Sequence, residues 1–133
     1  MEELQRKKII IQYLDKWMCL REDGHSIGAY LKKQNILSAG IYGYSVLGRH
    51  LLRELEDAGV EVKWVMDQRD VSNQISCMYL QPDSSGAPKN VDVVIITAVT
   101  DVKEIEKKFL NMGFRIVISM EELFEEIGRY RKL

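Results

Sequence analysis

The sequence predicts an α/β fold, a small doubly wound parallel sheet of about five strands preceded by a pair of helices. From residue 36 onward, short apolar segments typical of strands alternate with segments whose apolar residues recur every three or four positions. Residues 92–97, DVVIIT, form a continuous apolar run, as expected for a strand buried on both faces of a parallel sheet. Strands joined by helices and short loops in this way pair in parallel with right-handed crossovers.

The composition is that of an ordinary globular domain. The chain has 133 residues, of which 46% are hydrophobic and 29% are charged. The formal net charge of −1 gives no support for nucleic acid or an anionic membrane as a partner. The longest apolar run, residues 93–99, is too short to span a bilayer, and Glu2 and Glu3 do not resemble a secretory leader. We therefore expect a cytoplasmic protein that binds neither nucleic acid nor membrane.

The two cysteines, Cys19 and Cys77, are far apart in the sequence and have apolar neighbours. There is no C-x-x-C pair and no cluster of cysteine with histidine. This pattern favours two reduced core residues over a disulfide or a redox pair. It also predicts no metal site.

Residues 3–22 are predicted to form a helix, followed by a second short helix. The apolar stripe of the first consists of Leu4, Lys7, Ile11, Leu14 and Met18, widened by Ile10 and Trp17. Gly24 ends this helix, and Ser26 is a natural cap for the second. We expect residues 1–35 to form a helical extension packed on the domain of residues 36–133. The extension has no obvious chemistry, so it is either a lid or a partner-binding surface.

The rest of the chain divides into alternating elements. Strands are predicted over residues 36–42, 60–66, 75–80, 92–97 and 115–118. Helices are predicted over residues 46–58, from an Asp101 cap to Met112, and over 120–130 after a capping box of Ser119 and Glu122. Residues 81–90, QPDSSGAPKN, contain both prolines and are a loop by composition. The connection after the third strand is too short for a full helix, which suggests a trimmed version of the fold.

A glycine-rich turn lies between the first of these strands and its helix. In the dinucleotide-binding pattern G-x-G-x-x-G, the first glycine allows the tight turn, the second admits pyrophosphate and the third lets helix and strand pack closely. Gly43 and Gly48 occupy the first and third positions, whereas Ser45 occupies the second. The serine hydroxyl either donates to a phosphate oxygen or crowds the ligand. A turn kept for packing alone is the other interpretation.

An acidic residue follows the next strand, as this class of site requires. Asp67 lies 24 residues after Gly43, close to the ~20 residues expected for a carboxylate that binds the ribose hydroxyls of NAD. Arg69 could instead meet the 2′-phosphate of NADP. Because Asp67 is nearer the strand end, the sequence favours NAD, with NADP or another nucleotide as alternatives.

Ligands of open α/β sheets bind at the carboxyl ends of the strands, so residues 97–101 after the fourth predicted strand also belong to the candidate site. Thr100 could contact a ligand there or merely cap the following helix. The predicted nucleotide-contacting residues are Gly43, Tyr44, Ser45, Val46, Leu47, Gly48, Asp67, Gln68, Arg69, Thr97 and Ala98.

Residues 36–133 resemble the small Rossmann-like modules of bacterial polysaccharide-biosynthesis proteins, found beside or within nucleotide-sugar epimerase/dehydratase proteins and glycosyltransferases. The matching stretches are AGIYGYSVLGRHLLRELEDAGVEVKWVMDQ, VDVVIITAV and RIVISMEELFEEI. The resemblance implies a Rossmann fold and a nucleotide ligand contacted at Gly43, Gly48 and Asp67. Ser45 departs from the family pattern at the position closest to pyrophosphate.

The sequence offers no clear catalyst. Short-chain dehydrogenases and sugar epimerases use a Tyr-x-x-x-Lys pair, and no tyrosine of this chain is followed by lysine at that spacing. A nucleophile elbow, G-x-S-x-G, is also absent. Arg49 and His50 follow Gly48 and either approach a phosphate or lie on a solvated helix face.

Three functions remain open at this point. The first is an NAD-like nucleotide-binding module, accessory to surface-polysaccharide or nucleotide-sugar metabolism and without independent catalysis. The second is part of a nucleotide-sugar oxidoreductase or epimerase that a partner protein completes. The third is a degenerate Rossmann domain that dimerises through residues 3–33. The apolar N-terminal stripe and an exposed third strand also favour a homodimer.

Overall fold

The computed structural model describes residues 1–83 and 86–131 and confirms the predicted fold class. Five parallel strands form one sheet in the order β3-β2-β1-β4-β5. The strands are β1 (Ser38–Tyr42), β2 (Glu61–Met66), β3 (Met78–Leu80), β4 (Val93–Ile96) and β5 (Val117–Ser119). The chain reverses its direction of winding between β1 and β4, as in a Rossmann-like sheet.

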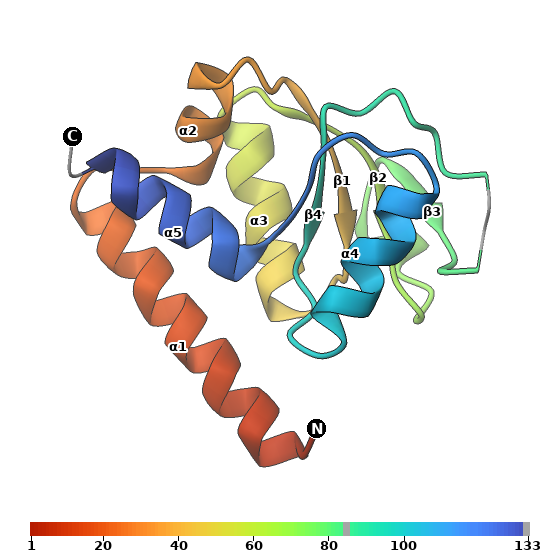
Figure 1. Cartoon of the computed structure of the whole chain (residues 1–133), viewed down its shortest axis with the longest axis horizontal. Coiled ribbons are helices and arrows are strands. Elements are labelled where there is room, and N and C mark those ends of the chain that lie inside the picture. The colour runs from red at the N-terminus through yellow and green to blue at the C-terminus, as the bar shows by residue number, and fades with distance from the viewer. Residues whose placement is uncertain (84–85, 132–133) are drawn as a thin grey trace.

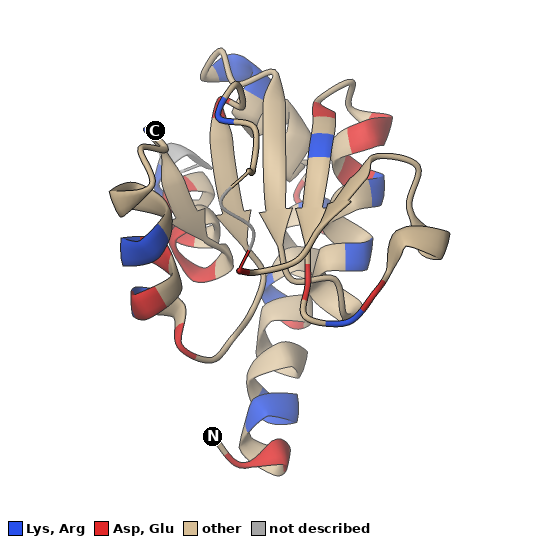
Figure 2. Ribbon diagram, turned by 90° about the vertical axis from the view of Figure 1, so that its right-hand side faces the viewer, with Lys and Arg blue, Asp and Glu red and all other residues tan. Residues whose placement is uncertain are grey.

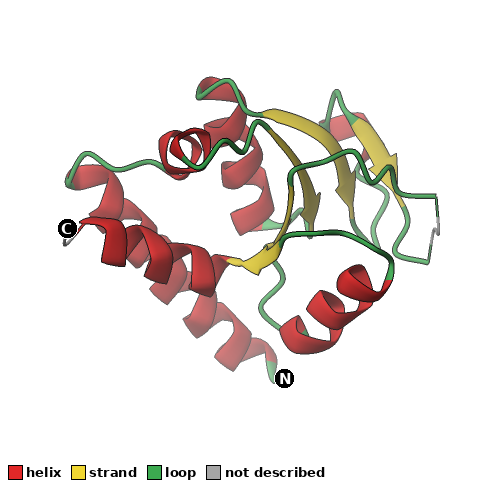
Figure 3. Ribbon diagram, turned by 45° about the horizontal axis from the view of Figure 1, so that its top comes forward, coloured by secondary structure: helices red, strands yellow, loops and turns green. Residues whose placement is uncertain are grey.

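Helices cover the two faces of the sheet unequally (Figures 1 and 3). The α-helices are α1 (Glu3–Glu22), α2 (Ile27–Lys33), α3 (Val46–Asp57), α4 (Val102–Asn111) and α5 (Met120–Arg131). Helices α1, α2, α3 and α5 contribute to one hydrophobic cluster with the sheet, whereas α4 contributes to a second cluster. The predicted N-terminal helix pair therefore shares a continuous core with the sheet.

The connections on both sides of β3 are reduced, in agreement with the expectation of a trimmed fold. A short 3₁₀ helix, Ser72–Gln74, replaces the α-helix between β2 and β3. Among the described residues, the connection from β3 to β4 contains no helix at all. The strand predicted over 75–80 begins only at Met78. The other predicted elements lie within two residues of the observed ends.

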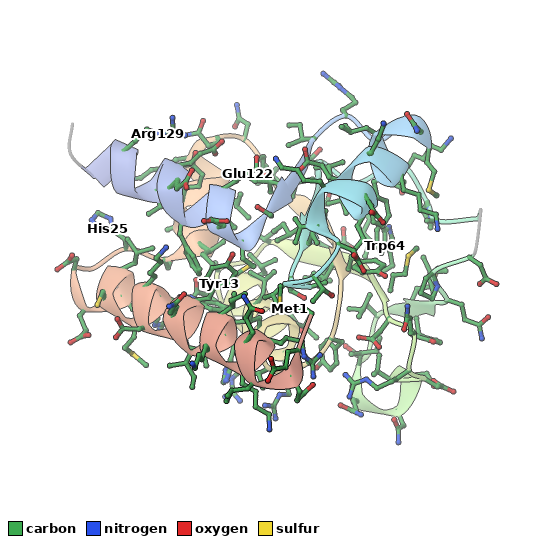
Figure 4. All side chains as sticks on the ribbon, turned by 60° about the horizontal axis from the view of Figure 1, so that its bottom comes forward. Met1, Tyr13, His25, Trp64, Glu122 and Arg129 are labelled. Atoms are coloured by element: carbon green, nitrogen blue, oxygen red, sulfur yellow. The ribbon has the colours of Figure 1, made fainter. Side chains whose placement is uncertain are left out.

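An aromatic cluster fills the space between the sheet and α4. Trp64 of β2 is fully buried there and contacts Phe109 and Phe114, with ring centroids 6.0 and 5.9 Å apart (Figure 4). A Cβ atom on Gly40 of β1 would lie 2.2 Å from the indole ring, so this strand position has no room for a side chain. The indole nitrogen donates to the carbonyl of Pro88 (3.1 Å), which fastens the loop after β3 over the cluster.

The structure corrects the predicted packing of α1. Only part of the predicted stripe faces the core, where Trp17 and Leu20 are buried and Ile10, Tyr13 and Leu14 pack beside them. The other members of the stripe are exposed, namely Lys7, Leu4 (57%), Ile11 (64%) and Met18 (59%). Cys19 is exposed as well, so the expectation of two core cysteines holds only in part; Cys77 is half-buried.

A buried carboxylate on α3 joins the N-terminal helices to the rest of the chain. Glu54 is only 7% exposed and accepts hydrogen bonds from Trp17 Nε1 (3.1 Å) and from the Ile27 amide (2.7 Å). The guanidinium of Arg21 forms an ion pair with the same carboxylate. Because α1 and α2 both donate to it, Glu54 fixes the position of each helix relative to α3.

We expect Glu54→Ala to lower the free energy of unfolding by about 3 kcal/mol, because it strands two buried N–H donors without acceptors. Arg21→Ala is the matched control, since the arginine side chain is 54% exposed and its loss should cost less than that of Glu54, because both buried N–H donors keep their acceptor. Urea denaturation followed by circular dichroism measures both changes. Equal losses in the two variants would contradict this role of Glu54.

Two carboxylates meet between α4 and α5. Burial raises the pKa of Glu106, and a hydrogen bond and the negative charge of Glu122 raise it further, while Lys103 acts in the opposite direction. Among the described residues, Oε2 of Glu106 is a buried oxygen that has no hydrogen-bond partner. The folded state therefore holds a proton on Glu106 more tightly than the unfolded state does.

A raised pKa makes this carboxyl group destabilising once the pH rises above its ordinary titration range. We expect Glu106→Gln to raise the melting temperature relative to wild type at about pH 7, with little difference at about pH 4, where the group is protonated in both states. Glu104→Gln, on the exposed face of the same helix, is the control and should give no gain at neutral pH. Thermal melts across this range test the expectation, and a gain that is independent of pH would contradict it.

Candidate functional site

A cavity of about 410 Å³ lies at the carboxyl ends of the strands, where β1 and β4 diverge. Open α/β sheets bind their ligands at this place, and the volume is within the usual range for small-molecule sites. The predicted site residues that line it are Gly43, Tyr44, Ser45, Asp67, Gln68, Arg69, Thr97 and Ala98. The remaining three, Val46, Leu47 and Gly48, do not line it: Leu47 is buried in the core, and Gly48 packs against the turn.

The two glycines of the turn are required by the backbone geometry. Gly43 has φ of +99°, and a Cβ there would also lie 2.6 Å from Thr97 Oγ1. A Cβ on Gly48 would lie 2.0 Å from the carbonyl oxygen of Gly43. Thr97 itself is buried, and its hydroxyl oxygen lies 2.8 Å from that same carbonyl oxygen, to which it donates. Helix, turn and strand β4 therefore meet in one close contact.

Ser45 stands at the N-cap position of α3 and at the wall of the cavity. Its side chain is exposed and makes no capping hydrogen bond. The first backbone hydrogen bond of the helix runs from the Arg49 amide to the Ser45 carbonyl (3.0 Å), and the amides before Arg49 have no carbonyl of the same helix to bind. Such amides and the positive end of the helix dipole favour an anion.

The Tyr44 side chain leaves the cavity open. Its ring is buried in the core cluster beside α3. Burial raises the pKa of its hydroxyl, and the positive charge of Arg49 on α3 lowers it in part. Tyr44 also borders a separate hollow with Glu56 and Gln74.

Asp67 supports the glycine turn directly. Its Oδ2 accepts from the Tyr44 amide (2.6 Å), and its Oδ1 accepts from the Arg69 amide (2.8 Å) and from Arg69 Nε (3.4 Å). Arg69 Nη2 donates in turn to the Tyr44 carbonyl (3.0 Å). The Tyr79 hydroxyl of β3 holds the backbone carbonyl of Asp67 (2.9 Å). Each carboxylate oxygen has two lone-pair positions, so Asp67 keeps capacity for one further donor, at Oδ2.

Further residues of the cavity wall were not among those predicted. Arg6 and Ile10 reach it from α1, and Ile105 from α4. Thr100 and Asp101, which belong to the predicted segment 97–101, line it as well. Arg6 and Ile10 carry no sequence signal for this position, because only the packing of α1 against the sheet brings them there.

The acidic residues around the cavity act on Tyr42 at the end of β1. Burial raises the pKa of the Tyr42 hydroxyl, and the negative charges of Asp67 and Asp101 raise it further. Asp101 adopts the left-handed conformation (φ 55°) at the N-cap of α4, and its side chain makes no capping hydrogen bond. Asp101 therefore occupies the predicted N-cap position, but its side chain does not form the capping hydrogen bond. A non-glycine residue in this conformation is strained, as is common at functional sites.

Other candidate residues lie elsewhere. His50 packs edge-on against Trp17 at the wall of a separate cavity between α1 and α3, and Arg49 borders the hollow beside Tyr44. His25 follows α1 at the opposite end from Met1 (Figure 4), whereas Met1 lies near Thr100 and Asp101. Within the described residues, no three His, Cys, Asp or Glu side chains are placed to hold a metal ion. Nor does any helix in that part of the chain have the length and apolar character needed to cross a membrane.

Comparison with known proteins gives no match to a family model, a curated protein or a solved structure.

The contact at Gly48 gives a test of this geometry. We expect Gly48→Ala to destabilise the protein by about 3 kcal/mol, because backbone atoms must move to admit the Cβ. Gly128→Ala, in α5, meets no atom within 4 Å and should instead stabilise by up to about 1 kcal/mol through helix propensity. Chemical denaturation measures both variants, and a neutral Gly48→Ala would show that the turn packs more loosely.

Proposed function

We propose that this chain binds a nucleotide, NAD-like by preference, as a module accessory to surface-polysaccharide or nucleotide-sugar metabolism and without independent catalysis. The observation that carries the proposal is the glycine turn at the start of α3, which borders an open cavity at the point where β1 and β4 diverge. Rossmann-like domains bind the phosphates of dinucleotides at this point.

The phosphate end of the ligand fits the N-terminus of α3. The exposed Ser45 hydroxyl stands there without an intramolecular capping contact, so it is available to donate to a phosphate oxygen in place of the missing second glycine. Arg6 and Arg69 also line the cavity, but Asp67 and Asp101 line it too, and the two arginines are paired with Glu3 and Asp67. The preference for an anionic ligand therefore rests on the helix amides, the helix dipole and the Ser45 hydroxyl.

The ribose end of the ligand fits Asp67. Its carboxylate lies at the end of β2 and lines the cavity while it holds the Tyr44 amide. The one remaining lone pair, on Oδ2, accepts a hydrogen bond from a ribose hydroxyl. Because the guanidinium of Arg69 is already bound to Asp67 and to the Tyr44 carbonyl, the arrangement favours NAD over NADP.

The accessory role rests on two sequence features. The chain has no Tyr-x-x-x-Lys pair, which the sugar epimerases and short-chain dehydrogenases use for proton transfer. Residues 36–133 also resemble the small modules that accompany polysaccharide-biosynthesis proteins. A module of this kind would bind the nucleotide and leave the chemistry to a partner protein.

Binding can be tested with a variant that keeps the helix but repels the ligand. NAD at ~100 times its dissociation constant adds ~2.7 kcal/mol of stability and should raise the melting temperature by roughly 10 °C. Ser45→Asp retains a good N-cap residue while placing a negative charge against the phosphate, so we expect the thermal shift to disappear. Ser26→Asp, at the N-cap of α2 and outside the cavity, should keep the full shift.

Calorimetric titration with NAD, NADP and a UDP-sugar would then rank the ligands. If none of the three ligands raised the melting temperature of the wild type by more than about 1 °C, the proposal would be overturned. An unchanged shift in Ser45→Asp would place any nucleotide elsewhere on the protein. Turnover of a UDP-sugar with NAD by the purified chain would contradict the absence of catalysis.

A further inference from the structure

Three exposed apolar side chains form a row along α1. Leu4, Ile11 and Met18 are 57, 64 and 59% exposed and recur every seven residues. At this spacing a helical position drifts by only about 20° per repeat, so the three side chains form a nearly straight row about 21 Å long. Isolated apolar residues are ordinary on a protein surface, but a row at coiled-coil spacing is typical of a face that packs on another helix.

Four exposed charges beside this row are divided between its two halves. Lys7 and Lys8 flank the N-terminal half, and Asp15 and Glu22 flank the C-terminal half. Glu3 and Arg21 also lie beside the row, but they form ion pairs with Arg6 and Glu54 of the same chain. An identical helix running in the opposite direction would bring the positive half of each copy against the negative half of the other. A parallel copy would instead place lysine against lysine and aspartate against aspartate.

We infer that the row is the docking surface for a second copy of this chain, bound antiparallel about a twofold axis near Ile11. In this arrangement Ile11 meets Ile11, Leu4 meets Met18 of the second copy, and Lys8 faces Asp15. Such a twofold contact is isologous, because the same surface patch serves both copies. The inference is independent of nucleotide binding.

A hollow at the Met18 end of the row improves the fit between the two copies. Met18 borders a cavity of about 270 Å³ between α1 and α3, whose wall includes Trp17 and His50. Antiparallel pairing brings Leu4 of the second copy to Met18, at the rim of this cavity. Leu4 can then bury its side chain in a space that α1 and α3 leave between them.

The shape of the molecule leaves room for the second copy. The N-terminal turns of α1 extend beyond the sheet (Figure 2), so this part of the helix stands clear of the strands. A single pair of helices buries less than the ~1,600 Å² of a typical stable interface. We therefore expect a dissociation constant in the range of about 1 to 100 μM.

Sedimentation equilibrium of the full chain, from low micromolar to several hundred micromolar concentration, tests the dimer. Ile11→Glu places two like charges at the axis and should weaken association by about 100-fold or more. Gln12→Glu is the matched control, because it adds the same charge at the neighbouring exposed position outside the row and should leave association within about threefold of wild type. Circular dichroism should show equal helix content in all three proteins.

A charge exchange tests the orientation of the two copies. Lys8→Glu and Asp15→Lys should each weaken the dimer, whereas the double variant should restore it, because the opposite charges meet again across the axis. Restoration is specific to an antiparallel pair of identical chains. Association that the double variant weakens further would overturn the antiparallel arrangement.

Other outcomes would overturn the inference altogether. A wild-type chain that stays monomeric at every concentration shows that no second copy binds the row. A dimer that Ile11→Glu leaves intact places the interface elsewhere. Binding of the monomer to vesicles containing anionic lipid, lost in Ile11→Glu, would identify a membrane surface rather than a second copy as the occupant.

Discussion

The approach of Gly48 to the carbonyl oxygen of Gly43 is the constraint on which the arrangement of helix, sheet and cavity depends. It sets where α3 begins relative to β1, and the hydroxyl of Thr97 ties β4 to the same carbonyl group. No side chain fits at either glycine, so the backbone of the turn and the start of the helix pack directly against each other. This close contact packs the domain and also places the first turn of α3 beside the cavity.

The fold could be predicted because its signals are local. Alternation of apolar runs with helical periodicity identified the strands, and the composition of residues 81–90 identified the reduced connection. The orientation of α1 could not be predicted in the same way, because this helix has apolar residues on two sides and periodicity does not say which side packs inward. The burial of Glu54 could not be predicted either, because a glutamate in an amphipathic helix is usually a surface residue. Only the tertiary structure shows that it accepts hydrogen bonds from donors of α1 and α2.

The candidate site was partly predictable for a related reason. Residues at the carboxyl ends of parallel strands gather at one edge, so the turn, Asp67 and Thr97 were expected together and the structure brings them together. Two features of the site follow only from the three-dimensional structure. Arg6 belongs to the cavity wall only through the tertiary packing of α1. The bond between Asp67 and the Tyr44 amide shows that the same carboxylate that could bind a ribose also braces the turn.

The anchoring of α1 at Glu54 has a consequence for access to the cavity. Trp17 is held at Glu54, while Arg6 lies three turns away at the cavity wall. Eleven helical residues span about 16 Å, so a tilt of about 10° around Trp17 would displace Arg6 by about 3 Å. That displacement is as long as a hydrogen bond. The angle between α1 and α3 therefore sets the distance between Arg6 and the rest of the cavity wall, and a partner that changed this angle by binding α1 would move Arg6 with it.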